Sequence, residues 1–162
     1  LVPELHGPIG EPKQPPPRWT EERFQDEVAK LPADVADIVR DVHAWMREVG
    51  GGVRFGSGTA CGSSSLVLPI GGKPVRAVTV WTDGSLEPTC APLISAAPEV
   101  AEKIHSRVRR LSGFRHLGDA PSASQVKIGD TFVGRPSDLA EFKAAVQEAV
   151  DAVRAQSTGG QP

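Results

Sequence analysis

Hydrophobic and polar positions alternate between residues 53 and 93 at the two-residue period of β-strands. Leu66, Leu68 and Ile70 share one face of such a strand, and Gly71-Gly72 follows with the backbone freedom that a two-residue hairpin turn needs. Asp83-Gly84 is a second, stronger hairpin signal. Turns this short join only antiparallel neighbours, so the pattern predicts an antiparallel β-meander.

Four strands are expected in the meander, at residues 53–55, 64–70, 75–81 and 86–90, and a fifth short strand at 125–128. Strict alternation divides the third strand into two faces: Val75, Ala77, Thr79 and Trp81 on one, Arg76, Val78 and Val80 on the other.

Segments with helical periodicity precede and follow the strands. Thr20 is a good N-cap for a first helix, and Pro32 either breaks that helix or starts the next one. Pro98 fits the first turn of a third helix that Gly113 stops. Ser137 is expected to cap the last helix. The second helix has the clearest apolar stripe: Val35, Ile38, Val39, Val42, Trp45, Met46 and Val49. His43 lies beside that stripe and is expected to face solvent rather than a metal.

These elements predict an α+β fold. A four- to five-stranded antiparallel meander has two helices before it and two after it, and the helices cover mainly one face of the sheet. Residues 1–18 are rich in proline and are predicted to be a linker, residues 19–154 a single domain, and residues 155–162 a disordered tail. The linker, and a chain that starts at Leu1, favour a module cut from a longer protein.

Composition narrows the classes of partner. The formal net charge of −2 gives no global attraction to nucleic acid or to an anionic membrane. No apolar run has the length of a membrane span, so we expect no membrane contact and a cytoplasmic location. The two cysteines, Cys61 and Cys90, are expected to be free thiols in a reducing compartment, although an oxidising one would permit a bridge.

One basic concentration stands out on the third predicted helix. Lys103, Arg107 and Arg110 follow one border of its apolar stripe, and Arg115 comes just past its end. Such a border can meet phosphates or an acidic partner. Cations near a helix C-terminus are also expected from the helix dipole alone, so a solvated helix face is the alternative.

The loop at residues 56–63 is the other segment with chemical interest. The loop candidates are Gly58, Cys61, Gly62 and Ser63, and the glycines and hydroxyls of the loop are those of a phosphate-binding loop. Phosphate loops lead into a helix, however, and this one leads into a strand without a lysine, which favours a flexible hairpin loop. Cys61 is the better candidate for a thiol nucleophile, but no spacing selects His43, His105 or His116 as its base.

Other catalytic patterns are incomplete. A serine nucleophile at 63–65 lacks the glycine of a nucleophile elbow. Asp83 and Glu87 are the nearest approach to a metal-dependent nuclease motif, yet the required lysine is missing. We therefore predict no catalytic residue, no metal site and no cofactor, and leave open whether the chain is an enzyme.

Several glycines and aromatic residues recur in an arrangement that resembles a C-terminal accessory domain of uncharacterised bacterial proteins. The shared features are Trp19 with Phe24, Trp45, the 55–58 sequence FGxG, Gly62-Ser63, the 80–84 sequence VWTxG and the final amphipathic helix. The chain differs at Cys61, and at Ser64 where an aromatic residue is expected. The resemblance implies an accessory module, sometimes placed behind a predicted nuclease-like domain, and it implies no catalytic residues.

The functional prediction is a non-enzymatic interaction module whose partner is another domain of its parent protein or a second protein. The alternatives are a nucleic-acid accessory domain that uses the basic border, and a thiol enzyme that uses Cys61. The first hypothesis predicts an exposed apolar patch.

Overall fold

The computed structural model describes residues 14–50 and 52–159, and this part of the chain has the predicted α+β fold. The helices are α1 (Glu21–Val28), α2 (Ala33–Val49), α3 (Ala91–Ala96), α4 (Pro98–Val108), α5 (Ile128–Thr131) and α6 (Pro136–Thr158), with the 3₁₀ helix η1 (Ser112–Phe114). The strands are β1 (Val53–Phe55), β2 (Ser63–Ile70), β3 (Lys73–Trp81), β4 (Ser85–Glu87) and β5 (Val126–Lys127).

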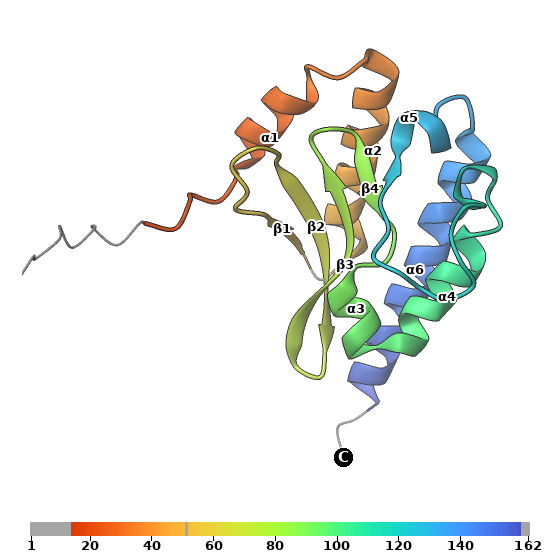
Figure 1. The fold of residues 1–162 in the computed structure, drawn as a ribbon. Helices are drawn as coiled ribbons and strands as arrows, with labels where there is room; N and C mark the ends of the chain where they lie inside the picture. Colours follow the sequence, from red (N-terminus) through yellow and green to blue (C-terminus); the bar gives the residue numbers. More distant parts are fainter. Residues whose placement is uncertain (1–13, 51, 160–162) are drawn as a thin grey trace, which may run out of the picture.

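The five strands form one antiparallel sheet in the order β1-β2-β3-β4-β5 (Figure 1). The predicted meander and its short fifth strand are thus confirmed. Gly71, Gly72 and Gly84 have positive φ, as the two predicted hairpin turns require. β4 ends at Glu87 rather than at residue 90, because Pro88 has no N–H to continue the ladder and Cys90 already occupies the N-cap of α3.

A β-bulge corrects the predicted faces of the third strand. The register of β2 and β3 shifts between Leu66, opposite Val78, and Val67, opposite Arg76, which leaves Ala77 as the extra residue. Strict alternation would put Arg76 on the same face as Val78. An extra residue reverses the parity of a strand, so Arg76 instead lies on the face of Thr79.

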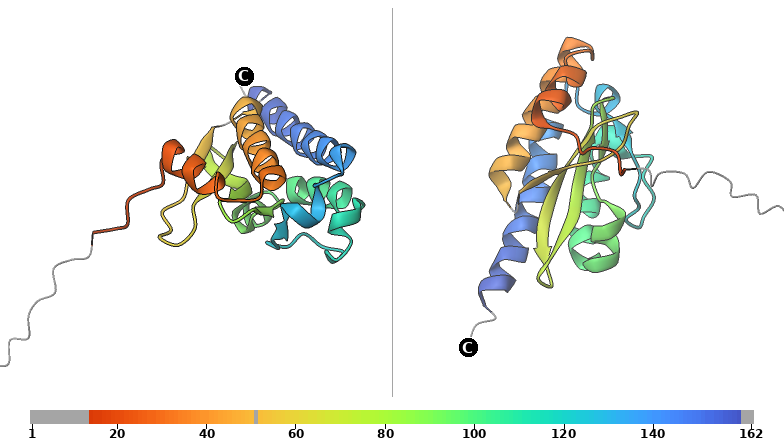
Figure 2. Two further views of the ribbon diagram at one scale, coloured as in Figure 1. Left: turned by 90° about the horizontal axis from the view of Figure 1, so that it is seen from above. Right: turned by 90° about the vertical axis from the view of Figure 1, so that its left-hand side faces the viewer.

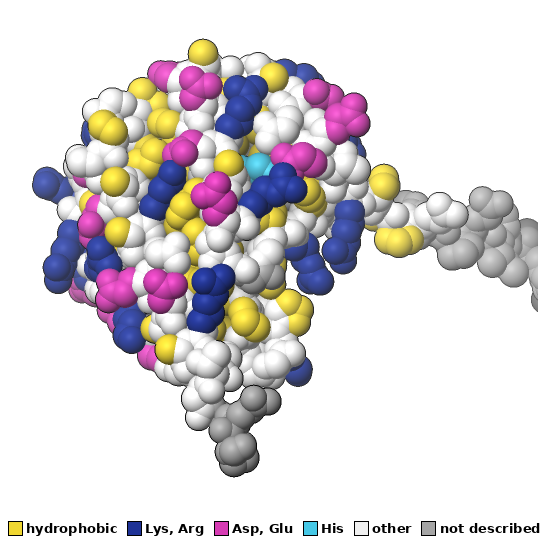
Figure 3. Space-filling view, turned by 180° about the vertical axis from the view of Figure 1, so that it is seen from behind, with side chains coloured by type: hydrophobic (Ala, Val, Ile, Leu, Met, Phe, Trp, Pro, Cys, Tyr) yellow, Lys and Arg dark blue, Asp and Glu magenta, His cyan; other side chains and the backbone are white. Residues whose placement is uncertain are grey.

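Helices lie on both sides of the sheet, unequally. α2 and α6 cover one face, and the short α3 packs on β3 from the other side (Figure 2). α4 packs against α3 and α6. Seen from behind, the outer surface mixes acidic and basic side chains without a broad area of one sign (Figure 3). One cluster of buried apolar side chains joins the helices to the sheet.

The long helices follow their predicted stripes. Thr20 caps α1 through a hydrogen bond from the Arg23 N–H, and α2 ends at Val49 with Gly50 as its C-cap. α4 buries Val100, Ile104 and Val108 as expected. The apolar face predicted for the last helix is buried throughout in α6: Phe142, Ala145, Val146, Ala149, Val150 and Val153.

Several local predictions need correction. The helices α3 and α5 were not predicted, since each is too short to establish a helical period. α4 stops at Val108, well before Gly113. α6 begins at Pro136 rather than after a Ser137 cap, and it continues to Thr158, into the segment expected to be a tail. Of the predicted linker, residues 1–13 lie outside the described residues, and residues 14–18 form neither helix nor strand.

Candidate functional site

The loop at residues 56–63 encloses an aromatic side chain. The Trp19 N–H donates to the Gly56 carbonyl at 2.9 Å, and the Trp19 indole N–H donates to the Gly58 carbonyl at 2.5 Å. A Cβ on Gly62 would lie 2.4 Å from the indole ring, so only glycine fits beneath it. Trp19 therefore anchors the entry to α1 on this loop, and the loop runs into β2 as predicted.

Cys61 is half-buried in the same loop. Its sulfur lies 3.3 Å from Thr82 Oγ1 and 3.6 Å from the Gly62 carbonyl oxygen. Within the described part of the chain, its hydrogen bonds involve no histidine, and His105 instead contacts the Gly118 carbonyl at 2.8 Å. The contacts that would activate Cys61 as a nucleophile are thus not among those it makes.

Cys90 lies at the end of a buried polar chain on the α3 side of the sheet. Ser65 Oγ is 2.7 Å from Thr79 Oγ1, which is 3.1 Å from Cys90 Sγ. Burial raises the pKa of the Cys90 thiol to about 12, an effect that the hydrogen bond from Thr79 only partly offsets. Cys90 is also only 2% exposed, and a buried thiol with a raised pKa is a weak candidate for a nucleophile.

The basic border of α4 is partly neutralised by α6. Arg107 donates through Nε and Nη2 to Glu141 at 2.9 and 2.6 Å, and it also pairs with Glu148. Lys103 and Arg110 are exposed and form no ion pair among the described residues. Arg115 is likewise exposed, just beyond η1. The nucleic-acid interpretation of this border stays a prediction.

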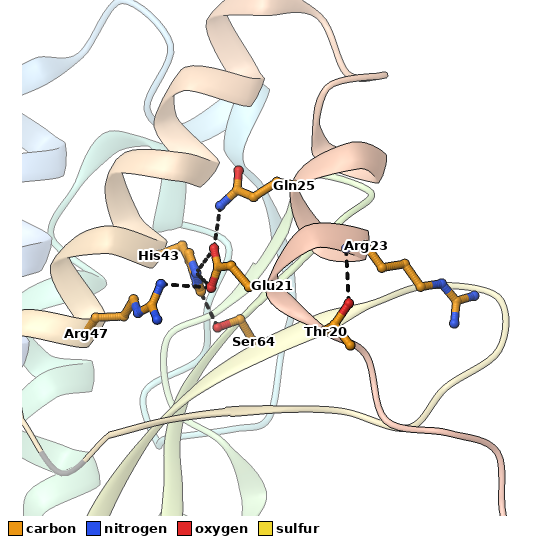
Figure 4. A network of polar contacts seen from close by, with 7 residues as sticks. All are labelled: Thr20, Glu21, Arg23, Gln25, His43, Arg47 and Ser64. Atoms are coloured by element: carbon orange, nitrogen blue, oxygen red, sulfur yellow. Dashed lines mark hydrogen bonds and ion pairs between the residues drawn. The ribbon is translucent and has the colours of Figure 1, made fainter.

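The structure brings together a Ser–His–Glu chain that sequence spacing did not reveal. His43 Nδ1 lies 2.9 Å from Ser64 Oγ, and His43 Nε2 lies 2.9 Å from both carboxylate oxygens of Glu21 (Figure 4). Gln25 and Arg47 also donate to Glu21, each at 2.9 Å. The chain connects α1, α2 and β2, and it corrects the expectation that His43 faces solvent, because only 2% of His43 is exposed.

The Ser–His–Glu chain of hydrogen bonds differs in geometry from a hydrolytic triad. In a triad the serine contacts Nε2 of the histidine and the carboxylate contacts Nδ1, whereas His43 has the two reversed. Ser64 is also fully buried, with an exposed fraction of 0%, and the rings of Phe24 and Phe55 pack against His43. Ser64 is thus closed to a substrate carbonyl in this structure.

Glu21 is held ionised by its neighbours. Burial acts to raise its pKa, but hydrogen bonds from Gln25 and His43, together with the charges of His43 and Arg47, lower the pKa below its ordinary value. Because the carboxylate faces Nε2, that nitrogen donates to it, and Nδ1 of the same ring shares a hydrogen bond with the Ser64 hydroxyl.

The sequence contains one signal for the Ser–His–Glu chain, the spacing that places His43 on the buried face of α2. Val39, His43 and Met46 have the four- and three-residue spacing of one helical face, and both apolar members are fully buried. His43 therefore occupies a core position of α2. Its partners Glu21 and Ser64 lie 22 and 21 residues away, and no local pattern pairs them.

A hollow of about 300 Å³ opens between the tip of the β2–β3 hairpin, the start of α4 and the last turns of α6. Ala97, Val100 and Val153 form its nearly buried floor, and Pro69 and Ile70 form an apolar wall. Glu99, Gln156 and Ser157 form a polar rim. We call it the hairpin-tip hollow.

Comparison with known proteins yields no match to this chain among family models, curated proteins or solved structures. The resemblance to a bacterial accessory domain therefore stays a prediction. Among residues 14–50 and 52–159, no cluster of three or more His, Cys, Asp or Glu side chains could hold a metal ion. None of the helices in this part of the chain combines the length and apolarity needed to cross a bilayer.

Proposed function

We propose that the domain is a non-enzymatic binding module that docks a segment of another protein, or of another domain of its parent chain, in the hairpin-tip hollow. The observation that carries the proposal is the hollow's composition. An apolar floor of Ala97, Val100 and Val153 surrounded by a polar rim is the arrangement of anchor pockets at protein interfaces.

The charge at the rim favours a particular docked segment. Among the described residues that line the hollow, Glu99 is the only charged one. A partner segment with one large apolar side chain beside a lysine or arginine would fill the hollow and pair with Glu99. A binding role also fits the inaccessibility of Ser64 and the buried thiol of Cys90. Free thiols at Cys61 and Cys90 are compatible with the reducing cytoplasm, where we infer that the protein works.

Selection of displayed random peptides on the immobilised domain tests the proposal. We expect enriched peptides to carry an apolar anchor with a basic neighbour. Fluorescence anisotropy should give binding about tenfold or more weaker for Ile70→Asn, which puts a polar group in the wall of the hollow. Glu99→Gln should relax the preference for the basic neighbour without abolishing binding.

Ile94→Asn is the matched control. Ile94 is also a half-buried isoleucine, but it lies on α3, outside the residues that line the hollow. Circular dichroism establishes that both variants fold. Peptides that bind Ile70→Asn as tightly as the unaltered domain, or a selection that enriches nothing above empty beads, would contradict the proposal.

A further inference from the structure

Three arginines from separate segments converge on a second hollow, on the face of the sheet opposite α2 and α6. Arg18 precedes α1, Arg54 is on β1 and Arg76 is on β3, and all three are exposed. The hollow has a volume of about 270 Å³. Its other lining residues are Phe55, Gly56, Ser57, Ser63, Ser65, Pro74 and Pro92.

Each arginine is brought to the hollow by a specific feature of the fold. Arg18 is next to Trp19, whose two hydrogen bonds fix the entering chain to the 56–63 loop. Arg54 lies opposite Ser65 in the β1–β2 register. Arg76 reaches this face only because the bulge at Ala77 reverses the parity of β3.

No carboxylate neutralises these charges within the hollow. Among the described residues, Arg18, Arg54 and Arg76 form no ion pair, in contrast to Arg107 and Arg109 on α4 and its C-cap. The lining, as far as the described part of the chain forms it, contains no acidic side chain. Glu87 on β4 lies opposite Thr79 of the neighbouring β3, on the same sheet face as Arg76, but it forms no ion pair with Arg76 among the described residues and is not part of the hollow's lining.

Hydroxyl groups complete the lining. Ser57 and Ser63 donate no side-chain hydrogen bond within the described residues, whereas the Ser65 hydroxyl is already bonded to Thr79. Ser63 Oγ lies so close to Gly56 that a Cβ there would be 2.3 Å from it. Two uncommitted hydroxyls thus accompany three uncommitted guanidinium groups.

We propose that this hollow, bounded by Arg18, Arg54 and Arg76, binds the phosphate group of a ligand. The planar guanidinium fork matches two phosphate oxygens, and serine hydroxyls donate to a third. Convergence on one small hollow, rather than an extended basic track, fits one or two adjacent phosphates. The site is separate from the hairpin-tip hollow and goes beyond the docking function proposed for it.

Calorimetric titration of the complete chain at low ionic strength tests the proposal, with inorganic pyrophosphate as one probe and a 5′-phosphorylated 12-nucleotide DNA single strand as the other. We expect saturable one-to-one binding of at least one probe. Arg54→Gln combined with Arg76→Gln should weaken it by a factor of about 100. Stronger binding of pyrophosphate assigns the site to a small ligand, and stronger binding of the oligonucleotide assigns it to a polynucleotide.

Arg110→Gln combined with Arg115→Gln is the matched control, because it removes the same charge from the α4 border. This variant should bind like the unaltered protein. The proposal is overturned if neither probe binds at millimolar concentration, or if both double variants weaken binding equally. It is also overturned if only the control variant loses binding, which would assign nucleic-acid recognition to the α4 border instead.

Discussion

Gly113 lies where η1 passes the short helix α5. A Cβ built on it would be 2.6 Å from the Thr131 Cα and 2.7 Å from the Thr131 methyl group. Since backbone atoms cannot move aside as a flexible side chain can, the approach of the two elements requires glycine at this position. The sequence had suggested a different role for Gly113, as the end of a helix that in fact stops at Val108.

Replacement of Gly113 by alanine should therefore destabilise the domain. We expect Gly113→Ala to lower the free energy of unfolding by about 1–3 kcal/mol, the usual cost of overpacking. Gly118→Ala is the control, because nothing lies within 4 Å of a Cβ at Gly118. Urea denaturation of both variants measures the difference, and equal stability of the two would show that η1 and α5 separate without cost.

At the scale of elements, α4 and α6 are joined by polar as well as apolar contacts. Buried Val108 of α4 and Ala145 of α6 belong to the apolar core. Arg107 of α4 forms ion pairs with Glu141 and Glu148 of α6. The hydrogen bond to Glu141, with the charges of Glu141 and Glu148, raises the pKa of the guanidinium group. A residue that sequence analysis assigned to a phosphate-binding border thus has a structural partner.

Loss of Arg107 should consequently affect stability more than loss of a neighbouring arginine. We expect Arg107→Gln to lower the Tm by a few degrees at most, the range of a surface ion pair, and Arg110→Gln to leave it unchanged. Salt at about 1 M should reduce the difference by screening. Thermal unfolding at two ionic strengths measures the Tm of both variants. Equal Tm values would mean that the contact between α4 and α6 depends on apolar packing alone.

The β-bulge is a second feature that belongs to the scale of elements. The sequence of β3 alternates without a visible break although the strand contains the bulge, so it does not indicate where the register shifts. Pairing with β2 decides that Ala77 is the extra residue, and it thereby decides which face carries Arg76.

For the molecule as a whole, two carboxylates with lowered pKa values make stability depend on pH. Burial acts to raise the pKa of Asp83, but hydrogen bonds from Ser85 and Lys127 and the charge of Lys127 lower it. Glu21 is lowered through Gln25, His43 and Arg47. The two groups join different elements. Asp83, at the β3–β4 turn, contacts Lys127 of β5, and Glu21, at the start of α1, contacts His43 and Arg47 of α2.

The direction of the pH dependence follows from linkage. A carboxylate whose pKa is lower in the folded state binds protons more readily when unfolded, so stability falls as the pH drops. The contribution of Glu21 is complete well above its unfolded pKa of about 4.5 and is lost as the pH falls through the lower folded value.

Removal of one of these carboxylates should weaken the acid sensitivity. We expect Glu21→Gln to be less stable than the unaltered protein at pH 7. The difference in their free energies of unfolding should narrow from pH 5 to pH 3. Because Glu21 is 38% exposed, solvent screening keeps the effect modest. Urea midpoints of both proteins at several pH values measure this difference in stability. A difference that stays constant with pH would rule out Glu21 as a source of the acid sensitivity.

The sequence by itself determined the elements whose signals are local. Helical stripes such as that of α6, the Thr20 cap and the Gly71-Gly72 and Asp83-Gly84 turns depend on residues within a few positions of one another. Those signals were sufficient for the α+β class and for the antiparallel pairing of β2 with β3 and of β3 with β4, since short turns leave no other connection. The pairing of β5 with β4 joins segments separated by α3, α4 and η1, and no local signal predicts it.

Only the tertiary structure decided the sites. The Glu21–His43–Ser64 chain, the partners of Arg107 and the group formed by Arg18, Arg54 and Arg76 join segments that are far apart in the sequence. Such contacts depend on strand register and on how helices pack, and these are fixed by the fit of the whole core rather than by any local pattern.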